Sequence, residues 1–290
     1  MSETTEGSPP IGDDRQTDAG ADQGFDSDAA ATEAARLDEA ERTATQMSQT
    51  TGRHPDLTLD DAYRIQAAWR SLRLARGERV IGHKIGLTSR AMQAAMQIET
   101  PDSGFLTDAM VFEPGTELAA STFCDPKLEV ELAFVLGQDL DRPDLTVDDV
   151  LAATDHVVPA LELIAARSHR RDPATGRART VVDTVADNAA NAGIITGGRA
   201  VAPTAIDLRW APALLYRNGV VEETGVAAGV LDHPANGIVW LARRYAQQGL
   251  RLEAGQTILA GSFTRPVDVR PGDVFRADYH DLGTFEIAFR

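Results

Sequence analysis

The alternation of apolar and polar side chains predicts a β-strand at KLEVELAFVLG, residues 127–137. Successive side chains of a strand point to opposite faces, so one face is uniformly apolar: Leu128, Val130, Leu132, Phe134 and Leu136. The other face carries Glu129 and Glu131 and then becomes apolar at Ala133 and Val135. A strand that is apolar on both faces is usually buried on both sides. We therefore expect the two glutamates to lie in a partly enclosed place.

Helical patterns dominate the first part of the chain. Alanine and charged residues predict one helix from Asp28 to a break at Thr51 and Gly52. A second helix is predicted over residues 57–77, because Thr58 is suited to cap its start and Gly77 to end it. Three further helices are expected after residue 80, among the strands. They are residues 89–97, the stretch before His156, and residues 233–249.

From Val80 onward the pattern predicts mostly short strands, separated by turns that contain glycine and proline. A turn is expected at Pro114–Gly115, a second apolar strand at residues 156–164, and a hairpin at Asn218–Gly219. Several more strands are expected near the C-terminus. Helices early and strands late predict an α+β protein with a mostly antiparallel or mixed sheet. The absence of GxGxxG and GxxxxGK[ST] motifs gives no support to a nucleotide-binding fold.

Composition divides the chain into an acidic tail and a folded part. The net charge is −16, and residues 1–42 alone contain 12 acidic residues and three arginines. Residues 1–30 are nearly devoid of large apolar side chains and are expected to be disordered. We expect an N-terminal helical and strand region at residues 31–115 and a β-rich catalytic region at 116–290. Residues 31–290 are expected to form one compact unit.

The charge pattern and the apolar runs exclude several classes of protein. No cluster of basic residues supports binding to nucleic acid. No run of about 18 apolar residues is present, and the first residues lack the pattern of a secretory signal. The single Cys124 is consistent with a reducing compartment. We expect a cytoplasmic protein with no membrane and no nucleic-acid partner.

A third isolated acid, Glu162, lies in the apolar stretch VVPALELIAA. Buried carboxylates are costly unless they are paired or bind a metal ion, and oxygen ligands favour Mg²⁺ or Mn²⁺. The alternative is that Glu129 and Glu131 face water at a solvated strand edge. Lys84, between glycines in GHKIGLTS, either extends its ammonium to solvent or acts in proton transfer with a lowered pKa.

The chain resembles a known family over residues 45–290. The stretches that carry the resemblance occur in the order GHKIGLTSRAMQ, KLEVELAFVLG, VVPALELI, DTVADNAANAG, LLYRNGVVEETGVAAGVLDHPANGIVWLA and LAGSFTRPV. They are similar to the 2-oxo-hept-4-ene-1,7-dioate and 2-oxopent-4-enoate hydratases of aromatic meta-cleavage pathways, within the fumarylacetoacetate hydrolase superfamily. The resemblance implies the β-rich, mixed-sheet fold of that superfamily and a homo-oligomer.

The resemblance also implies a site and a reaction. Glu129, Glu131 and Glu162 match the metal ligands, for Mg²⁺ or Mn²⁺, and Lys84 matches the active-site lysine. The expected reaction adds water to a 2-hydroxy-2,4-dienoate, a small-molecule substrate, to give a 4-hydroxy-2-oxo acid, with Lys84 as proton relay. The residues that resemble substrate-binding positions are Asp102, Asn188, Ser262, Phe263 and Thr264, with Asn191 as an alternative to Asn188.

The stretch HRRDPATGRARTVVDT, residues 169–184, resembles the branch that acts on 2-oxohept-4-ene-1,7-dioate. An arginine suits the distal carboxylate of that substrate, and Arg171, Arg177 and Arg265 are the candidates. Ala165 and Lys127 depart from the family pattern. The alternatives are a 2-oxo-3-enedioate (4-oxalocrotonate-type) decarboxylase, an acylpyruvate-type hydrolase, and a non-catalytic partner subunit of a decarboxylase.

Overall fold

The structure is a computed structural model that describes residues 25–90, 93–94 and 98–290. Its helices are α1 (Ser27–Thr43), α2 (Thr50–Arg53), α3 (Leu59–Ala75), α5 (Val147–Ala153), α6 (Val181–Ala186) and α7 (Ala235–Gln247). Its strands are β1 (Val80–Gly86), β2 (Asp102–Thr107), β3 (Val111–Phe112), β4 (Glu117–Leu118), β5 (Lys127–Leu136), β6 (Thr154–Ile164), β7 (Asn191–Thr196), β8 (Pro212–Arg217), β9 (Val220–Val226), β10 (Thr257–Leu259), β11 (Val267–Asp268), β12 (Val274–Asp278) and β13 (Thr284–Phe289).

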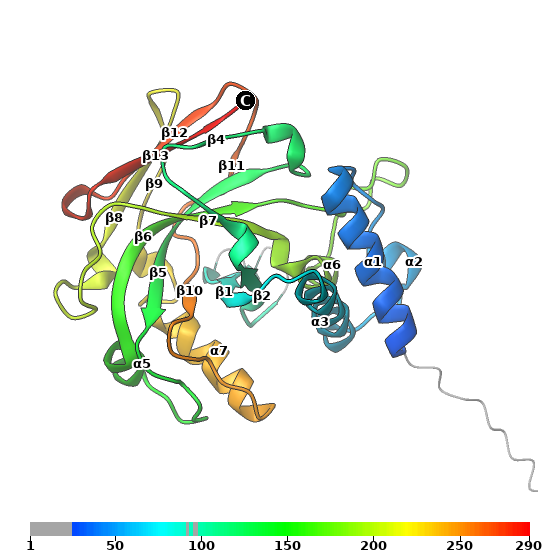
Figure 1. The fold of residues 1–290 in the computed structure, drawn as a ribbon, viewed down its shortest axis with the longest axis horizontal. Helices are drawn as coiled ribbons and strands as arrows, with labels where there is room; N and C mark the ends of the chain where they lie inside the picture. The colour runs from blue at the N-terminus through cyan, green and yellow to red at the C-terminus, as the bar shows by residue number, and fades with distance from the viewer. Residues whose placement is uncertain (1–24, 91–92, 95–97) are drawn as a thin grey trace, which may run out of the picture.

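The described strands form two sheets, which confirms the predicted α+β class. The larger sheet has the order β2-β1-β10-β5-β6-β7-β3, and β11 also pairs with β5. It is mixed, because β1–β10 and β3–β7 are parallel pairs and the other pairs are antiparallel. The smaller sheet has the order β4-β13-β12-β8-β9. Figure 1 shows the long strands β5 and β6 curving side by side through the molecule, with α7 beside one end.

The apolar face of β5 forms the centre of the main core. Its five alternating residues are at most 1% exposed, and they belong to one cluster with Phe275 and Ile287 of the smaller sheet. The opposite face of the larger sheet forms a separate cluster that contains Ala133 of β5 and Ala160 of β6. Glu129 and Glu131 share this second face with Ala133, so they lie inside the molecule and not at a solvated edge.

The helices α1, α2, α3 and α6 gather at one side of the larger sheet (Figure 1). Leu37, Ile65, Trp69 and Val185 bury a small core between α1, α3 and α6. The predicted start of α3 is confirmed, because the Thr58 hydroxyl accepts from the Asp61 backbone N–H and the Asp61 carboxylate accepts from that of Thr58. Among the described helices, none has the length and apolar character needed to cross a membrane.

Several predicted boundaries differ from the structure. The expected tail at residues 1–30 falls largely on residues 1–24, outside the described part, but Ser27 already begins α1 because Asp26 caps it. This first helix ends at Thr43, and the expected break at Thr51 and Gly52 lies inside α2. The expected helix at 89–97 includes the undescribed residues 91–92 and 95–97.

The other turns and helices follow the predictions closely, with one helix missed. The turn at Pro114–Gly115, the helix before β6 and the hairpin at Asn218–Gly219 are all present. Asn218 and Gly219 both have positive φ angles, 52° and 82°, as a two-residue hairpin turn requires. Helix α6 was not predicted, although it begins with a capping box between Thr180 and Asp183.

Candidate metal centre

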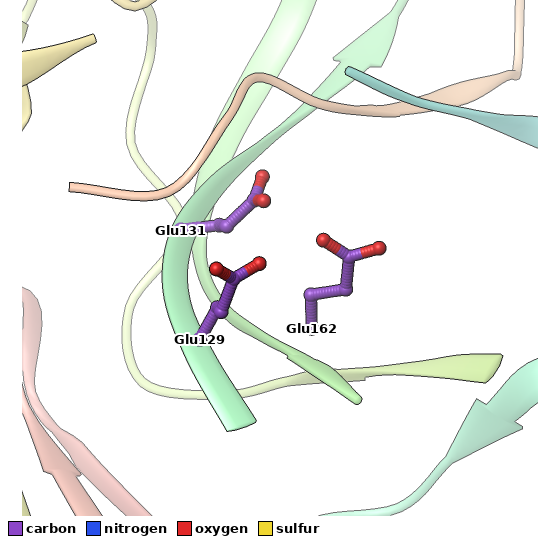
Figure 2. A group of neighbouring side chains, drawn as sticks. All are labelled: Glu129, Glu131 and Glu162. Carbon is purple, nitrogen blue, oxygen red and sulfur yellow. The ribbon is translucent and has the colours of Figure 1, made fainter. Parts of the chain in front are cut away.

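Three carboxylates meet on the inner face of the larger sheet. Glu129 of β5 lies directly opposite Glu162 of β6 in the strand register, and Glu131 is the next residue of β5 on the same face. Each glutamate offers one carboxylate oxygen, and these three oxygens lie within 4.8 Å of one another. Figure 2 shows the three side chains reaching into the same space from the two strands. Strand pairing thus brings Glu162 beside two glutamates that precede it by 33 and 31 positions in the chain.

The carboxylate cluster is buried. Glu131 and Glu162 are 1% and 0% exposed, and Glu129 is partly exposed. Burial, the charge of Glu162 and further nearby carboxylates raise the pKa of Glu129 to about 7. Burial, together with Glu162 and Glu129, raises the pKa of Glu131 well above its ordinary value. Both shifts show that the protein alone does not stabilise three negative charges here.

The hydrogen bonds around the cluster leave room for a cation. The backbone N–H of Gly261 donates to Oε2 of Glu131 at 2.8 Å, and the side-chain N–H of Asn191 donates to Oε1 of Glu162 at 2.6 Å. In the described part of the chain, Oε2 of Glu162 is buried and accepts no hydrogen bond. Three oxygen donors, one of them unsatisfied, fit a hard divalent cation such as Mg²⁺.

Lys84 lies beside this cluster on β1. Its Nζ is 3.4 Å from Oε1 of Glu162, and its side chain is 5% exposed. Burial alone would lower the pKa of Lys84, but Glu162, Asp102 and the two glutamates of β5 raise it above its ordinary value. The expected fall of this pKa is therefore wrong for the protein's own charges. A divalent cation among the glutamates would oppose their effect on the amine.

Asp102 lies close to Lys84 because Gly86 has no side chain. Asp102 of β2 pairs with Gly86 of β1, and a Cβ added at Gly86 would lie 2.3 Å from Oδ1 of Asp102 and 3.0 Å from Nζ of Lys84. Asp102 is 2% exposed, and burial raises its pKa, although Lys84 acts in the opposite direction. Asp102 Oδ1 also has no hydrogen-bond partner among the described residues. Two buried carboxylate oxygens of the site thus remain unsatisfied.

A cavity of about 660 Å³ opens onto the cluster. Its lining includes Lys84, Asp102, Glu129 and Glu131, and it also includes three residues that the sequence had placed at a substrate site: Ser262, Phe263 and Thr264. The volume lies in the usual range for a small-molecule site. Glu162 is fully buried at the back of this centre, where it contacts Lys84 and Asn191.

Asn188 and Asn191 have different surroundings. The amide of Asn188 accepts from the backbone N–H of Phe105 at 2.8 Å and donates to its carbonyl at 3.0 Å. Asn188 is not among the residues that line the cavity, and its bonds hold β2 in place. The expected substrate contact of Asn188 thus finds no support in its position. Asn191 instead orients the third glutamate.

The arginines of the cavity are only partly the expected ones. Arg265 lines the cavity, but Arg171 and Arg177 do not. Arg170 and Arg179 line it and were missed. Alternation alone could not separate Arg179 from Arg177, because residues two positions apart on a strand share a face.

Tyr279 was also missed. Its buried hydroxyl lies 2.8 Å from the carbonyl oxygen of Glu131 and 2.5 Å from that of Ala160. It therefore fixes the two strands that carry the glutamates. Lys127, next to the cluster in sequence, pairs with Asp268 instead.

This chain combines two sheets with a buried cluster of three carboxylates and an adjacent lysine. That combination fits an enzyme that uses a divalent cation. A model of the fumarylacetoacetate (FAA) hydrolase C-terminal family matches residues 80–290. The chain is 54% identical over 256 residues to 2-oxo-hept-4-ene-1,7-dioate hydratase from Escherichia coli, covering 88% of this chain and 96% of that protein. It is 40% identical over 235 residues to 2-keto-4-pentenoate hydratase from Paraburkholderia xenovorans (strain LB400), covering 81% and 85%.

The solved structures lead to the same family. 4-Oxalocrotonate decarboxylase from Pseudomonas putida G7, complexed with magnesium and adipate, matches with a TM-score of 0.88 and 34% identity, over 92% of this chain and 99% of that one. The chain belongs to the fumarylacetoacetate hydrolase family. The predicted family and fold are confirmed. The prediction of a hydro-lyase is confirmed as well, because relatives that align over most of the chain are hydratases.

Proposed function

We propose that this chain is a metal-dependent hydratase that adds water to a 2-hydroxy-2,4-dienoate or its 2-oxo-4-enoate tautomer. The product is a 4-hydroxy-2-oxo acid, and the preferred substrate is 2-oxohept-4-ene-1,7-dioate, formed in the degradation of aromatic compounds. The observation that carries this proposal is the buried carboxylate cluster with Lys84 at its edge, open to a cavity of about 660 Å³. The hydratase from Escherichia coli that is 54% identical supports the choice of substrate.

Glu129, Glu131 and Glu162 would hold the ion, Mg²⁺ or Mn²⁺. When bound, such an ion supplies a Lewis acid that stabilises negative charge on a substrate oxygen. The presence of magnesium in the related decarboxylase structure supports the choice of ion. Asn191 keeps Glu162 in position, and the Gly261 N–H does the same for Glu131.

Lys84 is the group best placed to move protons in this reaction. Protonation of the dienol at C5, with loss of the enol proton, gives a 3-en-2-one whose C4 accepts water. Nζ of Lys84 borders the cavity and lies 3.4 Å from a glutamate oxygen, so it can hold and donate a proton there. Asp102, also at the cavity, supports the charge of the ammonium. The hydroxyl of Thr264 accepts a hydrogen bond from the backbone N–H of Val130 at 3.2 Å. This bond ties the cavity lining to β5, the strand that carries Glu129 and Glu131.

The reaction product tests the proposal. Purified protein with Mg²⁺ is supplied with the dienol of 2-oxohept-4-ene-1,7-dioate, and the product is followed by mass spectrometry. We expect a gain of one water and the disappearance of the dienol absorbance. An unchanged dienol in the presence of folded, metal-loaded protein would contradict the hydratase proposal.

A second candidate function is decarboxylation of a 2-oxo-3-enedioate. It is favoured by one observation, the similarity to 4-oxalocrotonate decarboxylase from Pseudomonas putida G7 at a TM-score of 0.88. The same carboxylates and lysine would serve both reactions. Supplying 4-oxalocrotonate and measuring released CO₂ separates them. Abundant CO₂ without a hydrated product would favour the decarboxylase, whereas hydration without CO₂ supports the hydratase.

A further inference from the structure

The loop after β6 folds back on itself as a short antiparallel ribbon, defined here as residues 170–179. Arg171 bridges to Ala178, and the backbone N–H of Arg179 donates to the carbonyl of Arg170 at 2.9 Å. Arg170 and Arg179 are therefore opposite each other and share one face of the ribbon, while Arg171 points to the other face. Register, and not sequence proximity, decides which arginines of this segment share a side.

The face with Arg170 and Arg179 lines the cavity of the candidate metal centre. The other two arginines of the ribbon do not line the cavity. Arg177 lies two residues from Arg179 and so starts from the same face, but its guanidinium is held by Thr51. Nη1 of Arg171 donates to the carbonyl of Gly176 at 2.6 Å, and Nη2 of Arg177 donates to the hydroxyl of Thr51 at 2.7 Å. Only half of the ribbon's arginines can therefore meet a molecule in the cavity.

The ribbon brings an excess of positive charge to this part of the cavity. Asp187 accepts from Nη1 of Arg179 at 3.0 Å and also from Nε of Arg167 at 2.6 Å, and Arg167 lies 3.9 Å from Glu41 as well. The carboxylate that pairs with Arg179 does not itself line the cavity. The side chain of Arg179 is 7% exposed. Burial lowers the pKa of Arg179 to about 10, which leaves it charged at neutral pH.

Arg170 is held from outside the cavity. Its Nε donates to the Asp125 carboxylate at 2.7 Å and its Nη2 to the Asp125 carbonyl at 3.3 Å, and Asp125 does not line the cavity. Within the part of the chain that the structure describes, Nη1 of Arg170 has no partner. Asp125 therefore orients the guanidinium and leaves a donor for a ligand.

Arg265 is a weaker candidate for binding an anion. Its side chain is 83% exposed, and its Nε and Nη2 lie 2.8 and 2.6 Å from the Glu223 carboxylate. Glu223 also lines the cavity, so the pair adds no net charge there. The cavity is thus acidic at the glutamates, neutral at the Arg265–Glu223 pair and basic at the ribbon.

We propose that Arg170 and Arg179 bind the distal carboxylate of a linear dicarboxylic substrate whose 2-oxo acid end lies at the glutamates. This inference rests on the proposed function, and it specifies which residues select a dicarboxylate. A planar guanidinium suits a carboxylate, and a monocarboxylate would leave these donors unpaired.

A substrate pair tests the assignment. The kcat/KM values for 2-oxohept-4-ene-1,7-dioate and for 2-oxopent-4-enoate are measured for wild type, Arg170→Gln and Arg171→Gln. We expect Arg170→Gln to lower kcat/KM for the dioate by about tenfold to 100-fold, chiefly through KM, which is the usual range for a lost charge-assisted hydrogen bond. The values for pentenoate should stay within about twofold of wild type.

The matched control, Arg171→Gln, removes the same charge from the other face of the ribbon and should leave both substrates unaffected. Arg179→Lys keeps the positive charge beside Asp187 but removes the planar guanidinium with its paired N–H donors. It should also lower the ratio of kcat/KM for the dioate to kcat/KM for pentenoate. An unchanged preference in Arg170→Gln, or an equal loss with both substrates, would overturn the assignment.

Calorimetry with adipate and hexanoate on the Mg²⁺-loaded protein separates this inference from the proposed function. If wild type hydrates neither substrate but binds adipate, and Arg170→Gln loses that binding, the hydratase proposal fails while the dicarboxylate site stands. Adipate that binds wild type no better than hexanoate, or that binds Arg170→Gln as well as wild type, contradicts the dicarboxylate site.

Discussion

Replacing Glu129 with glutamine is expected to stabilise the metal-free protein at pH 8. Burial and neighbouring carboxylates raise the pKa of Glu129 from 4.5 to about 7. Each unit of such a shift corresponds to about 1.4 kcal/mol, so the ionised carboxylate costs at most about 3.5 kcal/mol of folding free energy above the raised pKa. Glutamine keeps the shape of the side chain and removes the charge.

The sign of this effect depends on pH. The pKa of Glu129 is higher in the folded state than in the unfolded chain, so its contribution to stability is fully present below pH 4.5. That contribution is lost as the pH rises through about 7. The stabilisation of Glu129→Gln relative to wild type should therefore be large at pH 8 and small at pH 5.

Urea denaturation in the presence of a chelator measures this difference. With saturating Mg²⁺ at pH 8 the order should reverse, because the ion stabilises the folded wild type by binding it, whereas the variant has lost a ligand. Glu286→Gln, at an exposed position of β13, is the matched control. It should leave the free energy of unfolding unchanged both with chelator and with Mg²⁺. A metal-free Glu129→Gln that is less stable than wild type at pH 8 would refute the reasoning.

Three further variants test the surroundings of the cluster. Lys84→Met should lower kcat by about 100-fold or more while Mg²⁺ binding measured by calorimetry persists, since a positioned acid–base group contributes that much; near-normal kcat would remove Lys84 from the chemistry. Asn191→Ala should weaken Mg²⁺ binding by about tenfold to 100-fold, because Glu162 loses its 2.6 Å hydrogen bond; an unchanged Kd would show that Glu162 needs no such support. Gly86→Ala should lower kcat, because the added Cβ would lie 2.3 Å from Oδ1 of Asp102, whereas Gly52→Ala, with open space around it, should not; equal activity of the two variants would contradict the close packing.

The sequence predicts which residues of this site lie on a buried strand face better than it predicts which strands pair with each other. The alternation in residues 127–137 is enough to place Glu129 and Glu131 on one face and to expect that face to be buried. Glu162 is noticeable only as an isolated acid in an apolar strand. Its position opposite Glu129 depends on the pairing of β5 with β6, which one-dimensional periodicity does not specify.

The errors each have a physical origin in the fold. Arg171, Arg177 and Arg265 were the candidates for a substrate contact, but of these only Arg265 lines the cavity, together with Arg170 and Arg179. Asn188 was expected to contact the substrate, yet its side-chain amide forms two hydrogen bonds with the backbone of Phe105. A lowered pKa was one of two interpretations of Lys84, and four carboxylates brought together by the fold raise it instead. The outcomes for Asn188 and Lys84 depend on contacts between segments that are distant in sequence, whereas the outcome for the arginines depends on how the short ribbon folds.

We propose that the cluster of Glu129, Glu131 and Glu162 binds the divalent ion on which hydration depends. The most direct test is the rate of hydration of 2-oxohept-4-ene-1,7-dioate after thorough chelation, and again after Mg²⁺ is added back. We expect activity to fall to background, to return with Mg²⁺ in wild type, and to return in Glu131→Gln only at much higher Mg²⁺ concentration. Full activity in the chelated wild-type protein would contradict it.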